Sequence, residues 1–199
     1  MTLSVLPFTT HTKEAADFAR QKKMELMLHL PCEPIGHPET ADPGPGSLFV
    51  NMSDVKILEL LRKDIAAVPG VTGVNNHMGS LFTQDERRMR VVLKELRKQN
   101  LFFLDSLTSS RSRVRSAAEK EGLAYIRRNI FLDNEQEQAA ILQQLKKAQA
   151  LAQKKGSCIA IGHPYPVTLA ALEKWQGERD KSVLMTTVSH LLKEKEAKK

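Results

Sequence analysis

The sequence predicts an α/β fold, a (β/α) barrel of about seven parallel strands that forms a single domain over residues 1–199. Short apolar runs alternate along the chain with longer amphipathic stretches, which is the order that parallel strands and their covering helices require. Polar side chains directly follow several of the apolar runs. Neither a dinucleotide-binding glycine pattern nor a phosphate-binding glycine loop follows any of them, which favours a barrel over an open nucleotide-binding sheet.

Seven short apolar runs are the strand candidates. Their lengths are those of buried strands, and polar or turn-forming residues bound them. They cover residues 3–6, 24–28, 71–74, 101–104, 124–126, 159–161 and, more weakly, 183–185. We expect residues 129–132 to be irregular.

Six amphipathic stretches between these runs predict helices. They cover residues 12–22, 54–67, 84–98, 111–121, 134–154 and 167–175. In the second of them, Ile57, Leu61 and Ile65 recur on one face. Thr83 followed by Glu86 is a capping-box pattern that predicts the start of the third helix. Asp133 followed by Gln136 is a looser version for the fifth.

The charge of the chain is positive without the pattern of a nucleic-acid binder. The formal charge is +7, from 30 basic and 23 acidic residues, and aromatic residues make up 5%. Basic residues gather in short helical runs and in a tail over residues 193–199, where no aromatic side chains alternate with them as base stacking requires. We therefore expect solvated helix faces and no nucleic-acid partner.

The chain also has no segment that predicts membrane insertion or export. It contains no run of about 18 apolar residues, the length of a membrane-spanning helix. Its first residues lack the basic start and the continuous apolar core of a signal peptide. We expect no membrane span.

Polar side chains able to bind metal or transfer protons recur at one structural position, the carboxyl end of a predicted strand. In parallel α/β folds these ends share one face, and that face carries the active site. One such residue alone is explained as a turn or a helix cap, but the repetition indicates a site. The residues are His29, Asn75, Asn76, His77, Asp105 and His163, with Asp133 after the irregular segment.

A long loop follows the second predicted strand. Residues 31–52 have no periodicity and are rich in proline and glycine, and loops of this length inside compact domains are usually functional or disordered. Its segment DPGPG, residues 42–46, is stiffened by two prolines. We expect it to form an ordered wall of a cleft, with Asp42 on the same face as His77 and His163.

A series of short motifs runs through the chain in order. The series is LSVLPF at residues 3–8, LHLP at 28–31 with Glu33 and Pro34, then DPGPG, GVNNHMGS, LFFLDS, FLDN, and AIGHP at 160–164. Together, over nearly the whole chain to Leu192, these motifs resemble the divergent polysaccharide deacetylase family. The resemblance implies a distorted (β/α) barrel, a divalent metal that is commonly zinc, a polysaccharide or oligosaccharide partner, and a periplasmic or secreted bacterial protein.

Two departures from that family stand out. Its members begin with an apolar strand that ends in a pair of aspartates, and this chain has no such residues before LSVLPF, so the resemblance predicts that the first strand is missing. Relatives also use two histidines four residues apart as metal ligands, where this chain has His29 and Glu33. A zinc site needs three protein ligands and an open position, and His77 is the expected third.

The resemblance also implies roles for the remaining residues. His163 matches the histidine that acts as the acid in active relatives, and Asp105 is the carboxylate that would orient it or support the metal. Contacts to the sugar are expected from four further residues, which are Asn75, Asn76, Asp42 and Asp133. The expected reaction is hydrolysis of an N- or O-acetyl group on a sugar.

Three functional classes remain open. The first is a metal-dependent carbohydrate deacetylase, inactive as given if the paired aspartates are essential. The second is a non-catalytic carbohydrate-binding relative, and the third is a basic-surface nucleic-acid binder. Metal content separates the first class from the others, and salt-dependent retention on polyanions separates the third. A missing first strand would leave the strand at residues 3–6 with an unpaired edge, which predicts a homodimer through that edge.

Overall fold

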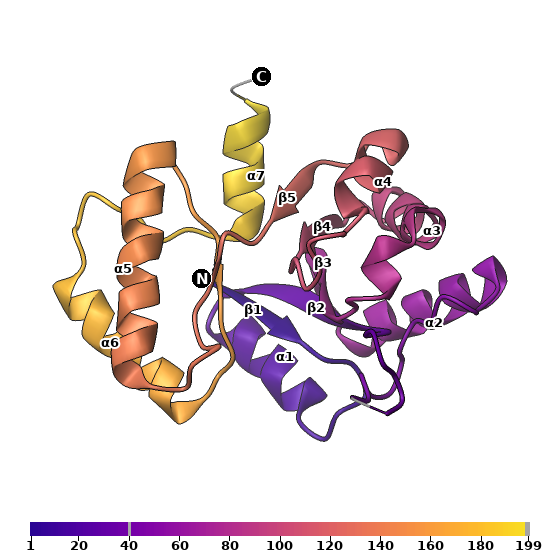
Figure 1. Cartoon of the computed structure of the whole chain (residues 1–199), viewed down its shortest axis with the longest axis horizontal. Helices are drawn as coiled ribbons and strands as arrows, with labels where there is room; N and C mark the ends of the chain where they lie inside the picture. The colour runs from indigo at the N-terminus through magenta and orange to yellow at the C-terminus, as the bar shows by residue number, and fades with distance from the viewer. Residues whose placement is uncertain (40, 198–199) are drawn as a thin grey trace. The chain divides into compact units, whose positions relative to one another are not determined.

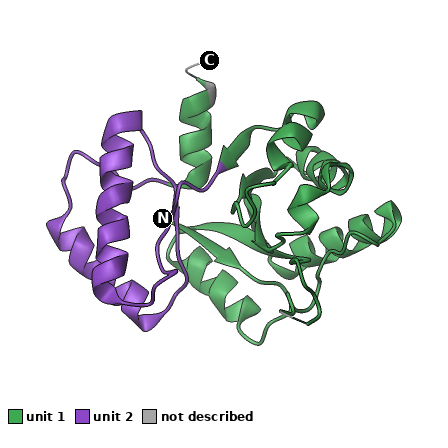
Figure 2. Cartoon of the chain, viewed as in Figure 1, with its two compact units in different colours: residues 1–126, 187–199 green, residues 127–186 purple. Residues whose placement is uncertain are grey.

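The structure is a computed structural model in which residues 1–39 and 41–197 are described. The chain is α/β and divides into two compact units, each described by itself (Figure 2). Unit 1 comprises Met1–Ile126 together with Thr187–Lys199, and unit 2 comprises Arg127–Thr186. The single domain, the closed barrel and its strand number stay predictions. No helix among the described residues combines the length and the apolar character needed to cross a membrane.

Unit 1 is built on a parallel sheet (Figure 1). Within the described residues its spatial order is β1-β2-β3-β4-β5. The pairs β1/β2, β2/β3 and β3/β4 are parallel, as the sequence predicts. The strands are β1 (Thr2–Val5), β2 (Glu25–Cys32), β3 (Gly73–Met78), β4 (Phe102–Asp105) and β5 (Tyr125–Arg127).

One face of this sheet forms the core of unit 1. Leu28 lies beside Val74, and Val74 beside Phe103, so these buried side chains share a face. They belong to one cluster with apolar residues of four helices, such as Leu61 and Leu93. The helices are α1 (Thr12–Gln21), α2 (Asp54–Ala67), α3 (Glu86–Lys98) and α4 (Val114–Glu121). Alternation along the strands therefore turns the odd-numbered residues of β2 and β3 to the opposite face.

The end of the chain belongs to unit 1. Helix α7 (Val188–Glu196), which the sequence analysis did not predict, begins beside the sheet. The backbone N–H groups of Val188 and Ser189 donate to the carboxylate of Glu25 at 2.8 and 3.1 Å. Strand β1 is at the end of the strand order and pairs with β2. Pairing of its edge with a second copy stays a prediction.

Unit 2 contains a short parallel pair and two helices. Strands β6 (Ile130–Phe131) and β7 (Ala160–Ile161) pair, and helices α5 (Gln138–Lys155) and α6 (Pro166–Glu178) follow them. Their buried residues form a separate core, made of Leu132, Ile141, Leu145, Ala171 and Trp175. The expected irregular segment 129–132 was wrong, because it contains β6.

The weak strand at residues 183–185 was also wrong. The structure has no strand there, and Leu184 is 81% exposed. Two cap predictions fail as well. Helix α3 is capped by Asp85, which accepts from the Arg88 N–H at 2.9 Å, while the Thr83 hydroxyl donates to the Gly79 carbonyl at 2.7 Å. Helix α5 begins after Glu137 without a side-chain cap. At α3 both contacts are local, so the helix uses a nearer cap than the one predicted.

Gly79 holds the turn that ends β3, and its replacement by alanine is expected to destabilise unit 1. Its φ is +81°, a region that alanine rarely adopts, and an added Cβ would lie 2.8 Å from the Cβ of Cys32. We expect a loss of about 2–3 kcal/mol in the free energy of unfolding, measured by urea denaturation. Gly44→Ala is the matched control, because Gly44 also has positive φ but nothing within 4 Å of its added Cβ. Equal losses of unfolding free energy in the two variants would show that the close contact with Cys32 does not contribute to the cost.

Candidate functional site

The polar face of the unit 1 sheet carries a histidine cluster. His29 lies directly beside Asn75 in the register of β2 and β3, and His77 lies two residues further along β3, beside Pro31. The strand ends predicted before these residues were wrong, because β2 continues to Cys32 and β3 to Met78. The side chains nevertheless come together, since residues of equal parity on neighbouring strands share a face.

Both histidines of this cluster are hydrogen-bonded in series. His77 Nδ1 is 3.1 Å from His29 Nε2, and His29 Nδ1 is 3.0 Å from the Oδ1 atom of Asn75. The two rings are 4.8 Å apart between centroids, at an interplanar angle of 66°. An amide oxygen only accepts, so His29 Nδ1 carries a proton. In the neutral pair His29 Nε2 therefore accepts the Nδ1 proton of His77. The lone pair of His77 is then on Nε2.

Asn75 is the centre of the polar contacts beneath the histidines. It is 3% exposed, and its Oδ1 accepts from the hydroxyl of Ser4 in β1 as well as from His29. Its Nδ2 donates to the Ser106 hydroxyl at 3.1 Å. One buried amide thus joins residues of β1, β2, β3 and the loop after β4. Such an arrangement fixes the His29 ring.

Asn76 lies on the opposite face of β3 and holds backbone. Its Oδ1 accepts from the Ser106 N–H at 2.9 Å, and its Nδ2 donates to the Met78 carbonyl at 2.8 Å. It is 1% exposed. The structure therefore gives Asn76 a supporting position under the loops after β3 and β4.

Asp105, at the end of β4, is fully buried and braces the loop that follows it. Its carboxylate accepts from the Leu107 N–H and the Ser112 hydroxyl, each at 2.8 Å, and from the Tyr125 hydroxyl at 3.4 Å. All of these partners belong to unit 1. The contacts match those of a residue that shapes a loop.

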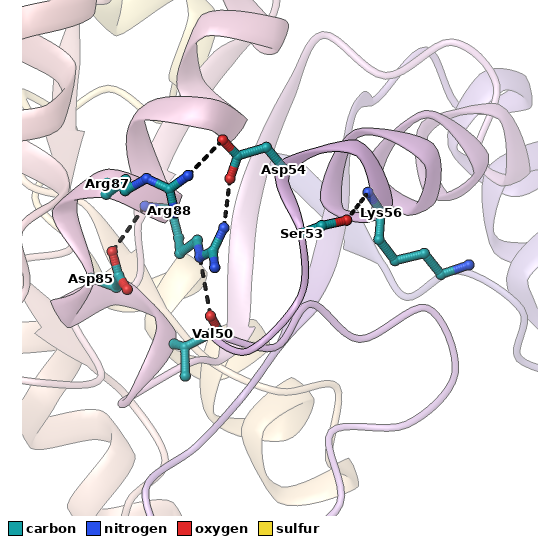
Figure 3. Close-up of polar contacts among 7 residues, drawn as sticks. All are labelled: Val50, Ser53, Asp54, Lys56, Asp85, Arg87 and Arg88. Carbon is teal, nitrogen blue, oxygen red and sulfur yellow. Dashed lines mark hydrogen bonds and ion pairs between the residues drawn. The ribbon is translucent and has the colours of Figure 1, made fainter.

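The long loop after β2 is fastened at its far end (Figure 3). The Val50 N–H donates to Glu33 Oε2 at 2.7 Å, and the Val50 carbonyl accepts from Arg88 Nε at 3.0 Å. Arg88 also reaches Asp54 at the start of α2, which Arg87 contacts as well. Both backbone groups of Val50 are thus held by side chains, so the loop returns to the sheet in one fixed place.

The DPGPG segment is ordered by its own contacts. Asp42 is exposed, and its Oδ1 accepts from the Gly44 N–H at 2.8 Å. Shortly after the segment, Leu48 pairs with the end of β2, where the Glu33 N–H donates to the Leu48 carbonyl at 2.9 Å. The loop therefore returns at the carboxyl end of β2. A contact of Asp42 with a sugar stays a prediction.

The same segment covers a buried carboxylate. Asp64 of α2 is 0% exposed, and within the described residues neither of its carboxylate oxygens has a hydrogen-bond partner. A Cβ added at Gly46 would lie 2.5 Å from Asp64 Oδ1, so the loop backbone rests directly on it. Burial raises the pKa of Asp64 to about 7.

The donor atoms of the predicted zinc ligands are hydrogen-bonded within the protein. Zinc needs three protein ligands with available lone pairs. Glu33 Oε2 is occupied by the Val50 N–H, and both ring nitrogens of His29 are in hydrogen bonds. No group of three or more His, Cys, Asp or Glu residues within 1–39 and 41–197 is arranged to hold a metal ion. A zinc site made of His29, Glu33 and His77 stays a prediction.

Unit 2 carries a separate pair of His163 and Asp133. His163 Nδ1 is 3.1 Å from Asp133 Oδ1, and the His163 N–H donates to Asp133 Oδ2 at 2.6 Å. The Thr168 hydroxyl donates to the same oxygen at 2.9 Å. The side chain of Asp133 is 0% exposed and that of His163 is 42% exposed. Asp133, expected to contact substrate, thus orients the histidine for which Asp105 was the expected partner.

Some residues of these clusters were missed from the sequence. They include Ser4, which interrupts an apolar strand, and Thr168, which follows the GHPYP segment by two residues. A polar residue at an inward position of a strand was the available signal for Ser4. No local pattern identifies Thr168, because its partner is 35 residues away. The convergence of His163 with His29 and His77 stays a prediction.

A hollow of about 450 Å³ opens elsewhere on unit 1. It is lined by residues from the loops after β2 and β3 and from the start of α3, which are Val50, Leu81, Gln84, Asp85 and Glu86. None of the predicted site residues lines it. The hollow therefore gives no support to the site.

Comparison with known proteins now adds the family to these observations. Residues 1–192 match the divergent polysaccharide deacetylase family, and the chain belongs to this family. The recognition made from the motifs is confirmed.

Two bacterial proteins are similar to this sequence. The uncharacterized protein YibQ of Escherichia coli (strain K12) is 34% identical over 194 residues, which is 98% of this chain and 60% of the relative. An uncharacterized protein of Haemophilus influenzae is 32% identical over 173 residues, 87% of this chain and 61% of the relative. This chain thus spans about three fifths of the length of these relatives.

A solved structure shares the fold. The crystal structure of the uncharacterized protein ATU2773 from Agrobacterium tumefaciens C58 is similar with a TM-score of 0.85 and 27% sequence identity. The match covers 89% of this chain and 72% of the other.

Proposed function

We propose that the chain binds acetylated polysaccharide and hydrolyses its N- or O-acetyl groups. The hydrogen-bonded series of His77, His29 and Asn75, in a chain of this family, is the observation that carries the proposal. Hydrolysis of an acetyl group needs a base that takes a proton from water and a donor that returns one to the leaving group. Each unit contains a histidine whose ring orientation is fixed by a buried polar side chain.

In unit 1 His77 is the proposed base. The hydrogen bond to His29 places the Nδ1 proton of His77 toward His29 and the lone pair on Nε2, which would take the proton from water. Asn75 holds His29 and so keeps this tautomer in place. This is the same division of work by which a buried carboxylate fixes a catalytic histidine.

In unit 2 His163 is the proposed proton donor. The Asp133 carboxylate accepts from its ring and its backbone, which sets the direction of the imidazole. Asp105, in contrast, braces a loop of unit 1, and its catalytic role stays a prediction. Zinc also stays a prediction, tested by metal analysis of the purified protein.

A second candidate is a carbohydrate-binding relative without chemistry. The glutamate at position 33 favours it, because the family resemblance implies a second metal-binding histidine there. Release of acetate from acetylated chitin oligosaccharides and acetylated xylan decides between the two. Binding without acetate release supports the second candidate.

Replacing His77 with alanine is expected to lower the rate of acetate release by about 100-fold or more, as for loss of a general base. The ring is half-buried on the polar face, so we expect the free energy of unfolding to change by less than about 1 kcal/mol. His11→Ala is the matched control, since the ring of His11 is 80% exposed in an ion pair with Glu14. Unchanged acetate release by the His77 variant would overturn the proposed role.

Location and assembly follow as further parts of this proposal. A protein that acts on bacterial polysaccharide works outside the cytoplasm, so we propose a periplasmic or secreted location. Pairing of β1 with a second copy is proposed from its position at the end of the sheet. Sedimentation of the purified chain tests the dimer, and a monomer at all concentrations would contradict it.

A further inference from the structure

Unit 2 contains aromatic side chains around His163 that the proposed chemistry does not use. The His163 ring is 5.2 Å from the Tyr165 ring and 5.5 Å from the Phe131 ring between centroids. The guanidinium of Arg128 lies over the Phe131 ring, 5.2 Å from its centroid. The Phe131 and Tyr165 rings thus flank the histidine held by Asp133. We call Phe131, His163 and Tyr165 the aromatic cluster.

Tyr165 is not part of the core of unit 2. Helix α6 turns Thr168, Ala171 and Trp175 inward, and these are buried. Tyr165 is 36% exposed, and Leu169 is 54% exposed. Leu169 lies in the first turn of α6, and its backbone N–H donates to the Tyr165 carbonyl at 2.9 Å. A partly exposed aromatic ring therefore remains beside His163, with Leu169 close to it along the chain.

The backbone of Tyr165 is held at the start of α6. It is the N-cap residue of α6, with φ −68° and ψ 146°, and Pro166 follows it at the first helical position. Its carbonyl accepts from the Leu169 N–H at 2.9 Å. Proline at this position is preorganised for the helix. A rigid aromatic residue of this kind binds with little loss of conformational freedom.

We propose that Tyr165 and Leu169 form a sugar-binding subsite of unit 2, on which one pyranose ring of the polysaccharide stacks beside His163. The inference rests on the proposed function for the class of ligand. The face of a pyranose presents C–H groups with partial positive charge, which complement the negative face of an aromatic ring. Its hydroxyls lie at the rim, within reach of a polar group such as the exposed part of His163. Sites of this composition, apolar with few polar groups, are typical of small-ligand binding.

The test measures binding of tetra-N-acetylchitotetraose and of acetylated xylan oligosaccharides to the full chain. Tyr165→Ala is expected to weaken binding of the preferred sugar about 3- to 10-fold, while Tyr165→Phe, which keeps the ring, retains it. If acetate is released, the alanine variant raises KM and leaves kcat nearly unchanged. Leu184→Ala is the control, since Leu184 is 81% exposed and lies outside the cluster.

A second readout locates the sugar. The side-chain NMR signals of His163 are expected to shift on titration with the sugar, and this shift is lost in Tyr165→Ala. Sugar binding or acetate release that Tyr165→Ala leaves unchanged overturns the subsite and leaves the proposed function standing. Binding that depends on Tyr165 without acetate release, and without an effect of His77→Ala, supports the subsite and contradicts the deacetylase. Failure of both sugars to bind overturns the subsite.

Discussion

Replacing Asp64 with asparagine is expected to raise the free energy of unfolding at pH 8 by roughly 2–4 kcal/mol and to leave it nearly unchanged at pH 4. Asp64 is buried under the DPGPG segment, and no described residue donates a hydrogen bond to its carboxylate. Burial raises its pKa from 3.8 to about 7. A shift of this size corresponds to at most about 4 kcal/mol between the two protonation states.

The sign follows from the raised pKa. The neutral form is favoured in the folded protein, so its stabilising effect is fully present below about pH 4 and is lost as the pH rises through about 7. Above that pH the folded protein holds a buried charge without a partner, which is costly. Asparagine has nearly the same shape and no charge. The variant should therefore remove this part of the pH dependence.

Urea denaturation at pH 4, 6 and 8, followed by circular dichroism, measures the effect. Glu39→Gln is the control, because Glu39 is exposed and its removal changes the net charge equally. If Asp64→Asn loses as much stability between pH 4 and pH 8 as the parent does, the Asp64 carboxylate does not cause the pH dependence of the free energy of unfolding. The single tryptophan, Trp175, belongs to unit 2, so its fluorescence shows whether that unit unfolds in the same transition.

Replacing Asn75 with alanine is expected to cost about 3–4 kcal/mol of unfolding free energy. The variant leaves the Ser4 hydroxyl and the His29 Nδ1 proton without their acceptor, and it removes the donor to Ser106. Each buried polar group that loses its partner costs on the order of 1 kcal/mol or more. The variant also disturbs the proposed catalytic site, because His29 without Asn75 no longer fixes the tautomer of His77.

Ser4→Ala is the matched variant for Asn75. It removes one hydrogen bond of the same cluster and is expected to cost about 1 kcal/mol. Urea denaturation measures both variants, and NMR contacts between the His29 and His77 rings report their arrangement. A cost below 1 kcal/mol for Asn75→Ala, with the ring contacts intact, would show that the amide does not organise the cluster.

Strands β2 and β3 extend beyond the ends that the sequence predicts. Apolar periodicity predicted the core segments of β1 to β4, and helix α2 begins and ends at the predicted residues. The predicted ends of β2 and β3 come too early, because apolar periodicity detects only the residues that are buried in an apolar core. The backbone ladder continues through His29, Asn75 and His77, where the side chains pair with one another. Strand pairing does not require apolar side chains.

Tertiary partners were beyond the reach of the sequence. Asp105 and Asp133 both follow apolar segments, and local reasoning did not identify Asp133 as a partner of His163. A buried charge, however, had a signal. Asp64 lies three residues after Leu61 and seven after Ile57, so helical spacing places it on the buried face of α2. An ionisable residue on the apolar face of a helix therefore predicts a buried ionisable group.

The return of the chain to Glu25 has a consequence for the order in which the protein acquires its structure during synthesis. Unit 1 is assembled from two stretches of sequence, and Val188 and Ser189 bond to a strand more than 160 residues upstream. Unit 2 is one continuous stretch of 60 residues that leaves the ribosome before α7 does. Contacts across such a separation form late, because a long loop must close first. The Glu25 carboxylate therefore gains these partners only after all of unit 2 has been synthesised, and nascent chains halted before residue 187 leave the carboxylate without them.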